Sequence, residues 1–263
     1  MSRKQVVPLC ILLAVLAWCG KGWGQSLTVA AAADLQFALR EIAGRFQKDT
    51  GKQVRVTFGS SGNFYAQIQN GAPFDVFFSA DFEYPRQLEA AGLTEPGTLC
   101  EYAVGKIVIW TLKESSLDLS RGLAVVGDAA VQRIAIANPE HAPYGRAAVS
   151  ALQYEKLYDL ARGKFVVGEN VSQVAAFVAS GNADLGIIAL SLASAPSLKE
   201  RGKYVEIPRE EYPAMRQAAI VLKSSKQKAT AKQFLDYVKS AAIVALLKTY
   251  GFSPGPAGSQ QTP

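Results

Sequence analysis

Serine and aspartate stand at the starts of two predicted helices in the first part of the chain. Ser61 lies in the segment Phe58-Gly59-Ser60-Ser61-Gly62, and Asp34 directly precedes a helical pattern. A helix start presents unpaired N–H groups and the positive end of the helix dipole. Several such starts facing one cleft could bind an anion without contact from Lys or Arg. These residues therefore indicate a receptor for a small oxyanion.

The chain lacks the residue sets that are typical of catalysis. Its single histidine, His141, lies between Glu140 and Ala142 in a Pro-flanked loop. No Gly-x-Ser-x-Gly motif, metal-ligand spacing or P-loop lies nearby. We therefore expect a protein that is not an enzyme and that holds no metal ion and no cofactor.

The first 24 residues have the features of a secretory signal peptide. Two basic residues precede an apolar stretch at 6–18, and Gly22 and Gly24 are spaced as in a signal-peptidase site. The apolar stretch is short for a membrane span, but a retained anchor stays an alternative. A lipoprotein modified at Cys19 is another, although Trp18 is bulky for the residue before a lipidated cysteine. We expect the mature protein in the periplasm.

Removal of the signal peptide changes both the charge and the cysteine content. It takes away three basic residues and no acidic one, so the formal charge falls from +6 to +3. A weak and scattered positive charge does not indicate a nucleic-acid-binding protein. Cys100 is the one cysteine left, so the hydrophobic core must hold the fold without an internal disulfide.

Strands and helices alternate along most of the chain, which predicts an α/β fold. Predicted strands lie at residues 27–33, 53–58, 74–79, 133–137 and 185–190. Predicted helices lie at residues 35–47, 63–70, 82–91, 146–154, 171–180, 226–238 and 241–250. In the first half this order predicts a largely parallel sheet with helices on both faces.

Two long apolar segments, at 102–112 and 215–222, could each cross between two lobes. We therefore expect one lobe at 26–103 plus 218–253 and a second at 104–217, joined by a two-strand hinge. In such a layout, ligands bind in a cleft at the carboxyl ends of the strands. The Pro-, Gly- and Gln-rich tail at 254–263 is expected to be disordered.

Three segments of the chain carry a resemblance. They are residues 29–35, residues 58–62 with 67–81, and residues 138–145, and Gly-Ala-Pro-Phe-Asp-Val-Phe-Phe-Ser-Ala-Asp at 71–81 is the most specific part. In this order they resemble the periplasmic molybdate-binding proteins of ABC importers. Tyr250-Gly251-Phe252 also fits, so the likeness runs from 27 to 252. The resemblance implies a two-lobe type II periplasmic binding-protein fold with mixed, mainly parallel sheets.

The resemblance also implies a function and a site. A monomeric receptor would capture molybdate, and also tungstate, and deliver it to a membrane permease. Hydroxyls and main-chain amides would hold the oxyanion, with no metal ion and no counter-charge in contact. The corresponding binding positions of this chain are Asp34, Ser61, Tyr144, Val171 and Ala189.

Two other ligand classes stay open as alternatives. One is a different tetrahedral oxyanion, such as sulfate or phosphate. The other is a small organic acid, which would usually require an Arg side chain in the cleft. Arg146 is the candidate for that role, and we expect it on the helix exterior.

Two positions depart from the relatives. Many relatives have Ser where this chain has Asp34, whose ionised carboxylate can only accept hydrogen bonds. We expect the Asp34 amide to donate to the ligand while the carboxylate turns away and caps the helix that begins at Leu35. Some relatives have Tyr where this chain has Ala189. Tyr144, where some relatives have Ala, could supply a phenol from the opposite wall.

Overall fold

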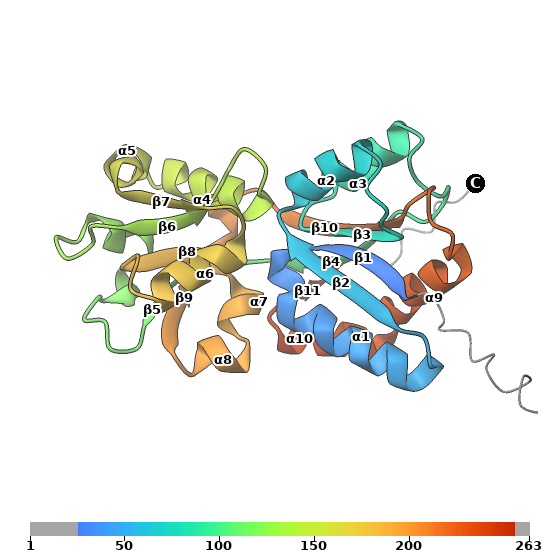
Figure 1. The fold of residues 1–263 in the computed structure, drawn as a ribbon. Helices are drawn as coiled ribbons and strands as arrows, with labels where there is room; N and C mark the ends of the chain where they lie inside the picture. The colour runs from blue at the N-terminus through green and yellow to red at the C-terminus, as the bar shows by residue number, and fades with distance from the viewer. Residues whose placement is uncertain (1–25, 256–263) are drawn as a thin grey trace, which may run out of the picture.

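The computed structural model describes residues 26–255, which form two lobes that lie side by side (Figure 1). The expected signal peptide at 1–24 lies outside these residues, as does most of the expected tail at 254–263. Each lobe is built on one β-sheet with helices on both faces. Between residues 26 and 255, no helix has the length and apolarity needed to span a bilayer.

The first lobe contains a six-stranded sheet in the order β11-β4-β10-β3-β1-β2. Its strands are β1 (Leu27–Ala32), β2 (Val54–Gly59), β3 (Val76–Ser79), β4 (Cys100–Gly105), β10 (Met215–Val221) and β11 (Ser253–Pro254). One face carries α1 (Gln36–Thr50), α9 (Lys228–Val238) and α10 (Ala241–Thr249), and the other carries α2 (Ser61–Gln69) and α3 (Glu83–Ala90). Phe46 and Phe234 pack in the first of these interfaces, and Phe64 and Phe77 pack in the second.

The second lobe contains a five-stranded sheet in the order β7-β6-β8-β5-β9. Its strands are β5 (Ile107–Leu112), β6 (Ile134–Ala137), β7 (Phe165–Gly168), β8 (Leu185–Ala189) and β9 (Gly202–Glu206). Its α-helices are α4 (Pro143–Tyr154), α5 (Tyr158–Ala161), α6 (Val171–Ala179), α7 (Leu190–Ala193) and α8 (Pro196–Lys199). The apolar strands β5, β6 and β8 are buried on both faces, which explains their continuous runs of Ile, Val, Ala and Leu.

Both sheets are mixed, as the resemblance implies, but parallel pairs do not predominate. Among the described strands, β1 pairs in parallel with β2 and β3, and β6 pairs in parallel with β7 and β8. The pairs β10–β3, β10–β4, β11–β4, β5–β8 and β5–β9 are antiparallel. These antiparallel pairs involve the strands next to the lobe crossings and the short C-terminal strand. Parallel pairing requires a crossover connection, whereas a chain returning from the other lobe can enter the sheet in the opposite direction.

The chain crosses between the sheets at Lys106 and at residues 207–214. The segment expected as one long strand is two strands, β4 and β5, each of which belongs to a different sheet. β10 does not cross, because Met215 already pairs with Gly105 of β4 in the first sheet. The second crossing instead contains the short 3-10 helix η4 (Arg209–Glu211). The expected boundaries at 103/104 and 217/218 therefore fall inside β4 and β10.

The start of the predicted tail is ordered as a strand. Ser253 pairs with Val104, and Pro254 pairs with Ala103, so that β11 forms the edge of the six-stranded sheet. Proline is compatible with an edge strand because the N–H that it lacks is not required there. The prediction of disorder from residue 254 onward was therefore wrong for Pro254.

Candidate functional site

A small cavity lies between the lobes, at the carboxyl ends of several parallel strands. β1 leads into the 3-10 helix η1 (Ala33–Leu35), β2 into α2, β6 into α4 and β7 into α6. The cavity is lined by the starts of these helices and the residues before them: Ala32, Ala33, Asp34, Gly59, Ser60, Ser61, Ala80, Ala142, Pro143, Tyr144, Asn170 and Val171. Its volume is about 10 Å³, which is near the roughly 10–15 Å³ needed for one water molecule. The two lobes are thus nearly closed upon it.

Backbone N–H groups at three of these helix starts have no helical partner. In α2 the side chain of Ser60 accepts from the amide of Asn63 at 3.3 Å, which leaves the first amide, that of Ser61, uncapped. In α6 the Asn170 side chain likewise accepts from the second and third amides, at 3.0 and 3.2 Å, and leaves that of Val171. In α4 Pro143 occupies the first position and has no N–H, so the amide of Tyr144 is the first donor.

The Ser61 side chain is fully buried at the cavity wall. Its Oγ accepts a hydrogen bond from the Ala80 amide at 2.9 Å. This bond uses the hydroxyl oxygen as an acceptor and leaves the hydroxyl proton available for donation. Ser61 therefore offers the cavity two donors, one from the backbone and one from the side chain.

The Asp34 carboxyl group is the one acidic group of the cavity lining, and it is buried. Its Oδ2 accepts from the Tyr144 hydroxyl at 3.0 Å and from Gln217 Nε2 at 2.7 Å. Its Oδ1 is also buried and makes no hydrogen bond with any described residue. Burial raises the pKa of Asp34 from 3.8 to about 6, although the bonds from Gln217 and Tyr144 act in the opposite direction.

The expected helix cap by Asp34 is wrong. Neither η1 nor α1 has a capping hydrogen bond from a side chain, although the nearby amides of Asp34 and Leu35 lower the carboxyl pKa. The carboxylate turns instead toward Tyr144 of the other lobe and Gln217 of β10. These two residues are distant in the sequence, and their side-chain O–H and N–H groups donate to Oδ2.

The Tyr144 phenol lies at the contact between the lobes. It donates to Asp34 Oδ2 and accepts from Gln217 Nε2 at 3.1 Å. Gly105 is required beside it, because a Cβ there would lie 2.5 Å from the phenol oxygen and 2.6 Å from Gln217 Nε2. The single phenol proton is thus directed to Asp34, so in this structure it is not available as a donor to a ligand.

Ala189 does not line the cavity. It ends β8, where it pairs with Ile107, and it is buried. Ser191, two residues later in α7, donates from its hydroxyl to the Asp34 carbonyl at 2.8 Å. The structure thus brings Asp34, Ser61, Tyr144 and Val171 together at the cavity and leaves Ala189 out of its lining.

Arg146 and His141 make contacts between the lobes. The guanidinium of Arg146 forms an ion pair with Asp81 at 2.6 Å and lies over the ring of Tyr84, outside the cavity lining. The backbone carbonyl of His141 accepts from the Gly62 amide at 2.8 Å. These contacts, with the Ser172 hydroxyl that donates to the Ala33 carbonyl at 3.0 Å, link the walls of the cleft.

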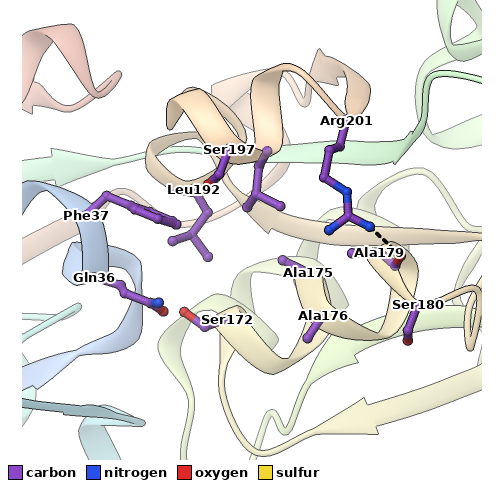
Figure 2. Close-up of a pocket in the computed structure, with 11 residues that line it drawn as sticks. Gln36, Phe37, Ser172, Ala175, Ala176, Ala179, Ser180, Leu192, Ser197 and Arg201 are labelled. Atoms are coloured by element: carbon purple, nitrogen blue, oxygen red, sulfur yellow. Dashed lines mark hydrogen bonds between the residues drawn. The ribbon is translucent and has the colours of Figure 1, made fainter.

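A larger cavity of about 470 Å³ lies beside the helix starts, between the beginning of α1 and helices α6 to α8 (Figure 2). Arg201 lines it and donates to the Ala179 carbonyl at 2.9 Å. Its other lining residues on α6, such as Ala175 and Ala176, have amides that the helix already uses. Ser61, Tyr144 and Val171, whose amides are free at their helix starts, line the smaller cavity and not this one, so we take the smaller one as the candidate site.

Sequence reasoning missed two residues of the site. Gln217 and Ser191 contact Asp34 across 183 and 157 positions of sequence, respectively. No local sequence pattern indicates that either residue belongs to the site. Pro143 did offer a usable signal, because proline favours the first position of a helix. That signal would have moved the predicted start of α4 back from Arg146 and placed Tyr144 in its first turn.

Comparisons with known proteins show the family to which the chain belongs. Residues 27–253 match the family model described as bacterial extracellular solute-binding protein. The chain is 41% identical to the molybdate-binding protein ModA of Azotobacter vinelandii, with 85% of this chain and 88% of the relative covered, and 37% identical to ModA of Rhodobacter capsulatus, with 85% and 86% covered. The structure of the Azotobacter vinelandii periplasmic molybdate-binding protein superposes with a TM-score of 0.81 at 38% identity, over 86% of this chain and 98% of that one. The chain therefore belongs to the family of bacterial extracellular solute-binding proteins that includes these molybdate-binding relatives.

Proposed function

We propose that this protein captures molybdate outside the cytoplasm and delivers it to the permease of an ABC importer. The observation that carries the proposal is the ring of helix starts around one cavity. The amides of Ser61, Tyr144 and Val171 and the Ser61 hydroxyl are donors, and Lys, Arg and His are absent from the described cavity lining. Such fixed dipoles suit an anion that needs only donors. The relatives named above are molybdate-binding proteins, which supports the same ligand.

The donors favour a fully deprotonated tetrahedral dianion. Every oxygen of molybdate or tungstate accepts hydrogen bonds, whereas hydrogen phosphate carries a proton that needs an acceptor. A proton left without an acceptor in a buried site costs about 1–3 kcal/mol. In the described cavity lining an ionised Asp34 carboxylate is the side chain that could accept it. Sulfate is also fully deprotonated, so selection against it would depend on its shorter bonds to oxygen and its smaller size. Tungstate resembles molybdate in size and charge and should bind as well.

Binding should involve a movement of the lobes. The cavity of about 10 Å³ is too small for an anion with four oxygens, so the walls must separate to admit it. Hinge motion about Lys106 and residues 207–214 would provide that opening, and closure would bury the anion. Burial strengthens each hydrogen bond to the charged ligand. The lobe built on the six-stranded sheet and the lobe built on the five-stranded sheet would move as two bodies.

A monomer in the periplasm, freed from its signal peptide, would present the closed lobes to the permease. Asp34, Ser61, Tyr144 and Val171 would contact the anion, mainly through their amides. The protein would carry its ligand unchanged, as a receptor rather than an enzyme.

Isothermal titration calorimetry of the mature chain with molybdate, tungstate, sulfate and phosphate tests the proposal. We expect one molybdate per chain, similar binding of tungstate and much weaker binding of the other two anions. Molybdate at micromolar concentration should also raise the melting temperature. Folded protein that gives no heat with either molybdate or tungstate would overturn the proposal, and heat with sulfate alone would reassign the ligand.

A further inference from the structure

The carboxyl group of Asp34 is at odds with a cavity that otherwise offers donors. Asp34 lines the cavity and is 1% exposed, and one of its oxygens, Oδ1, has no hydrogen-bond partner among the described residues. An ionised carboxylate beside a dianion would repel it, and the cavity lining holds no cation that could offset this repulsion. The proposed function therefore requires an explanation of this group.

The network behind Asp34 determines which carboxyl oxygen acts as an acceptor. The Tyr102 hydroxyl lies 2.7 Å from Gln217 Oε1 and 3.2 Å from the Ser79 carbonyl oxygen. Donation along the shorter contact leaves the amide nitrogen of Gln217 facing Asp34. That nitrogen and the Tyr144 hydroxyl both donate to Oδ2. Oδ2 is thus held as a carbonyl-type acceptor. A carboxylic acid whose proton is on Oδ1 fits these bonds without rearrangement.

The other groups that face this carboxyl group are neutral. Tyr144 on α4 and Tyr102 on β4 are the titratable ones, and burial raises the pKa of both phenols well above 10. Gln217 on β10 does not titrate in this range, and the hydroxyls of Ser172 and Ser191 donate to the backbone carbonyls of Ala33 and Asp34 instead of the carboxyl group. The ion pair between the lobes, Arg146–Asp81, is internally compensated.

We propose that the Asp34 carboxyl group is protonated when the anion is bound and donates a hydrogen bond from Oδ1 to an anion oxygen. The proton comes from the solvent, so each dianion captured at neutral pH brings one proton into the closed cavity. This inference rests on the proposed function and deepens it: the site recognises a dianion together with a proton. Asp34 then contributes a donor to the cavity rather than a negative charge.

A defined pH dependence follows. Without ligand, burial raises the pKa of Asp34 to about 6, so the group is mostly ionised at pH 7.5. The bound dianion raises this pKa further, since it is a nearby negative charge and an acceptor for the acid proton. Affinity should be flat well below pH 6 and should fall about tenfold for each pH unit above it, while the bound group stays protonated.

The test is calorimetric titration of the mature chain with molybdate in two buffers of different ionisation enthalpy at pH 7.5. We expect uptake of about one proton per molybdate, and a Kd that rises about tenfold between pH 7 and pH 8. In Asp34→Asn the amide donates without a proton, so both the proton uptake and the pH slope should vanish. Asp159→Asn removes a charge from an 87% exposed side chain and should keep both.

A second readout uses the unaltered protein. Infrared difference spectra, bound minus free, at pH 7.5 should gain a carboxylic acid C=O band in protein labelled with ¹³C-aspartate. Molybdate binding without proton uptake, with a flat Kd from pH 6.5 to 8.5 and without this band, would overturn the inference while the proposed function stands. Tighter binding of hydrogen phosphate without proton uptake would also overturn it, since Asp34 would then be an acceptor. Absence of molybdate binding at every pH would overturn both.

Discussion

Replacement of Asp34 by Asn should make the ligand-free protein less sensitive to pH. Burial raises the carboxyl pKa from 3.8 to about 6. A pKa that differs by one between the folded and unfolded states corresponds to about 1.36 kcal/mol. The group therefore accounts for about 3 kcal/mol of folding free energy that depends on pH. Asp34 is fully buried, so solvent screening does not reduce this value greatly.

The sign follows from the direction in which burial moves the pKa. Between pH 3.8 and about 6 the folded state binds more protons at Asp34 than the unfolded state does. The stability that this group contributes is therefore complete below pH 3.8 and is lost as the pH rises through about 6. The Asp34→Asn variant does not titrate at this position, so it does not lose this stability as the pH rises. The carbonyl oxygen of its side chain can still accept hydrogen bonds from Gln217 and Tyr144.

Urea unfolding of both proteins, without anion, at several values between pH 4 and pH 7.5 measures the effect. The stability of Asp34→Asn relative to the unaltered protein should rise by most of that about 3 kcal/mol across this range. Taking the difference cancels the other titrating groups, which the two proteins share. A difference that stays constant within about 0.5 kcal/mol would refute the reasoning about burial at this carboxyl group.

Three further substitutions test other contacts. Ser61→Ala removes a hydroxyl donor to a charged oxygen, which is worth about 1.5–3 kcal/mol, so calorimetry should show molybdate binding weakened about 10- to 100-fold. Gly105→Ala places a Cβ 2.5 Å from the Tyr144 phenol oxygen, so thermal unfolding should reveal a loss of about 1–3 kcal/mol. Arg146→Gln breaks the 2.6 Å pair with Asp81 between the lobes; stopped-flow release of molybdate should accelerate up to about fivefold, since a partly exposed pair contributes at most about 1 kcal/mol.

Matched control variants separate these effects from general damage. Ser180→Ala removes a serine hydroxyl away from the small cavity and should leave the affinity unchanged. Gly44→Ala adds a Cβ that meets no atom within 4 Å, so it should not destabilise the fold. Arg86→Gln breaks an exposed pair within α3 and should not alter release. Equal effects from a test variant and its control would contradict the assigned contact.

The local parts of the fold could be predicted from the sequence. The apolar spacing of Leu39, Ile42 and Phe46 predicts α1, whose buried face contains these residues. Ser61 follows a strand and precedes a helix, and it lies where that pattern places it, at the carboxyl edge of the sheet. Such features depend on neighbours within a few positions, which periodicity and capping residues report.

The parts that depend on distant residues could not be predicted. Whether Asp34 caps its own helix or accepts from Gln217 is decided by a strand 183 positions away. The direction of β10 and the position of the crossings depend similarly on pairing with β4 after the chain has returned from the other lobe. Local patterns carry no information on these contacts, and the sequence prediction failed at these points.

The account depends on the claim that fixed amide and hydroxyl dipoles hold a doubly charged anion without a cationic side chain. A crystal structure with tungstate, located by its anomalous scattering, tests that claim most directly. It should place the metal centre between the starts of η1, α2, α4 and α6, with the amides of Ser61, Tyr144 and Val171 about 3 Å from its oxygens. Tungstate found outside this cavity, or held there by Arg, Lys or His, would contradict the account.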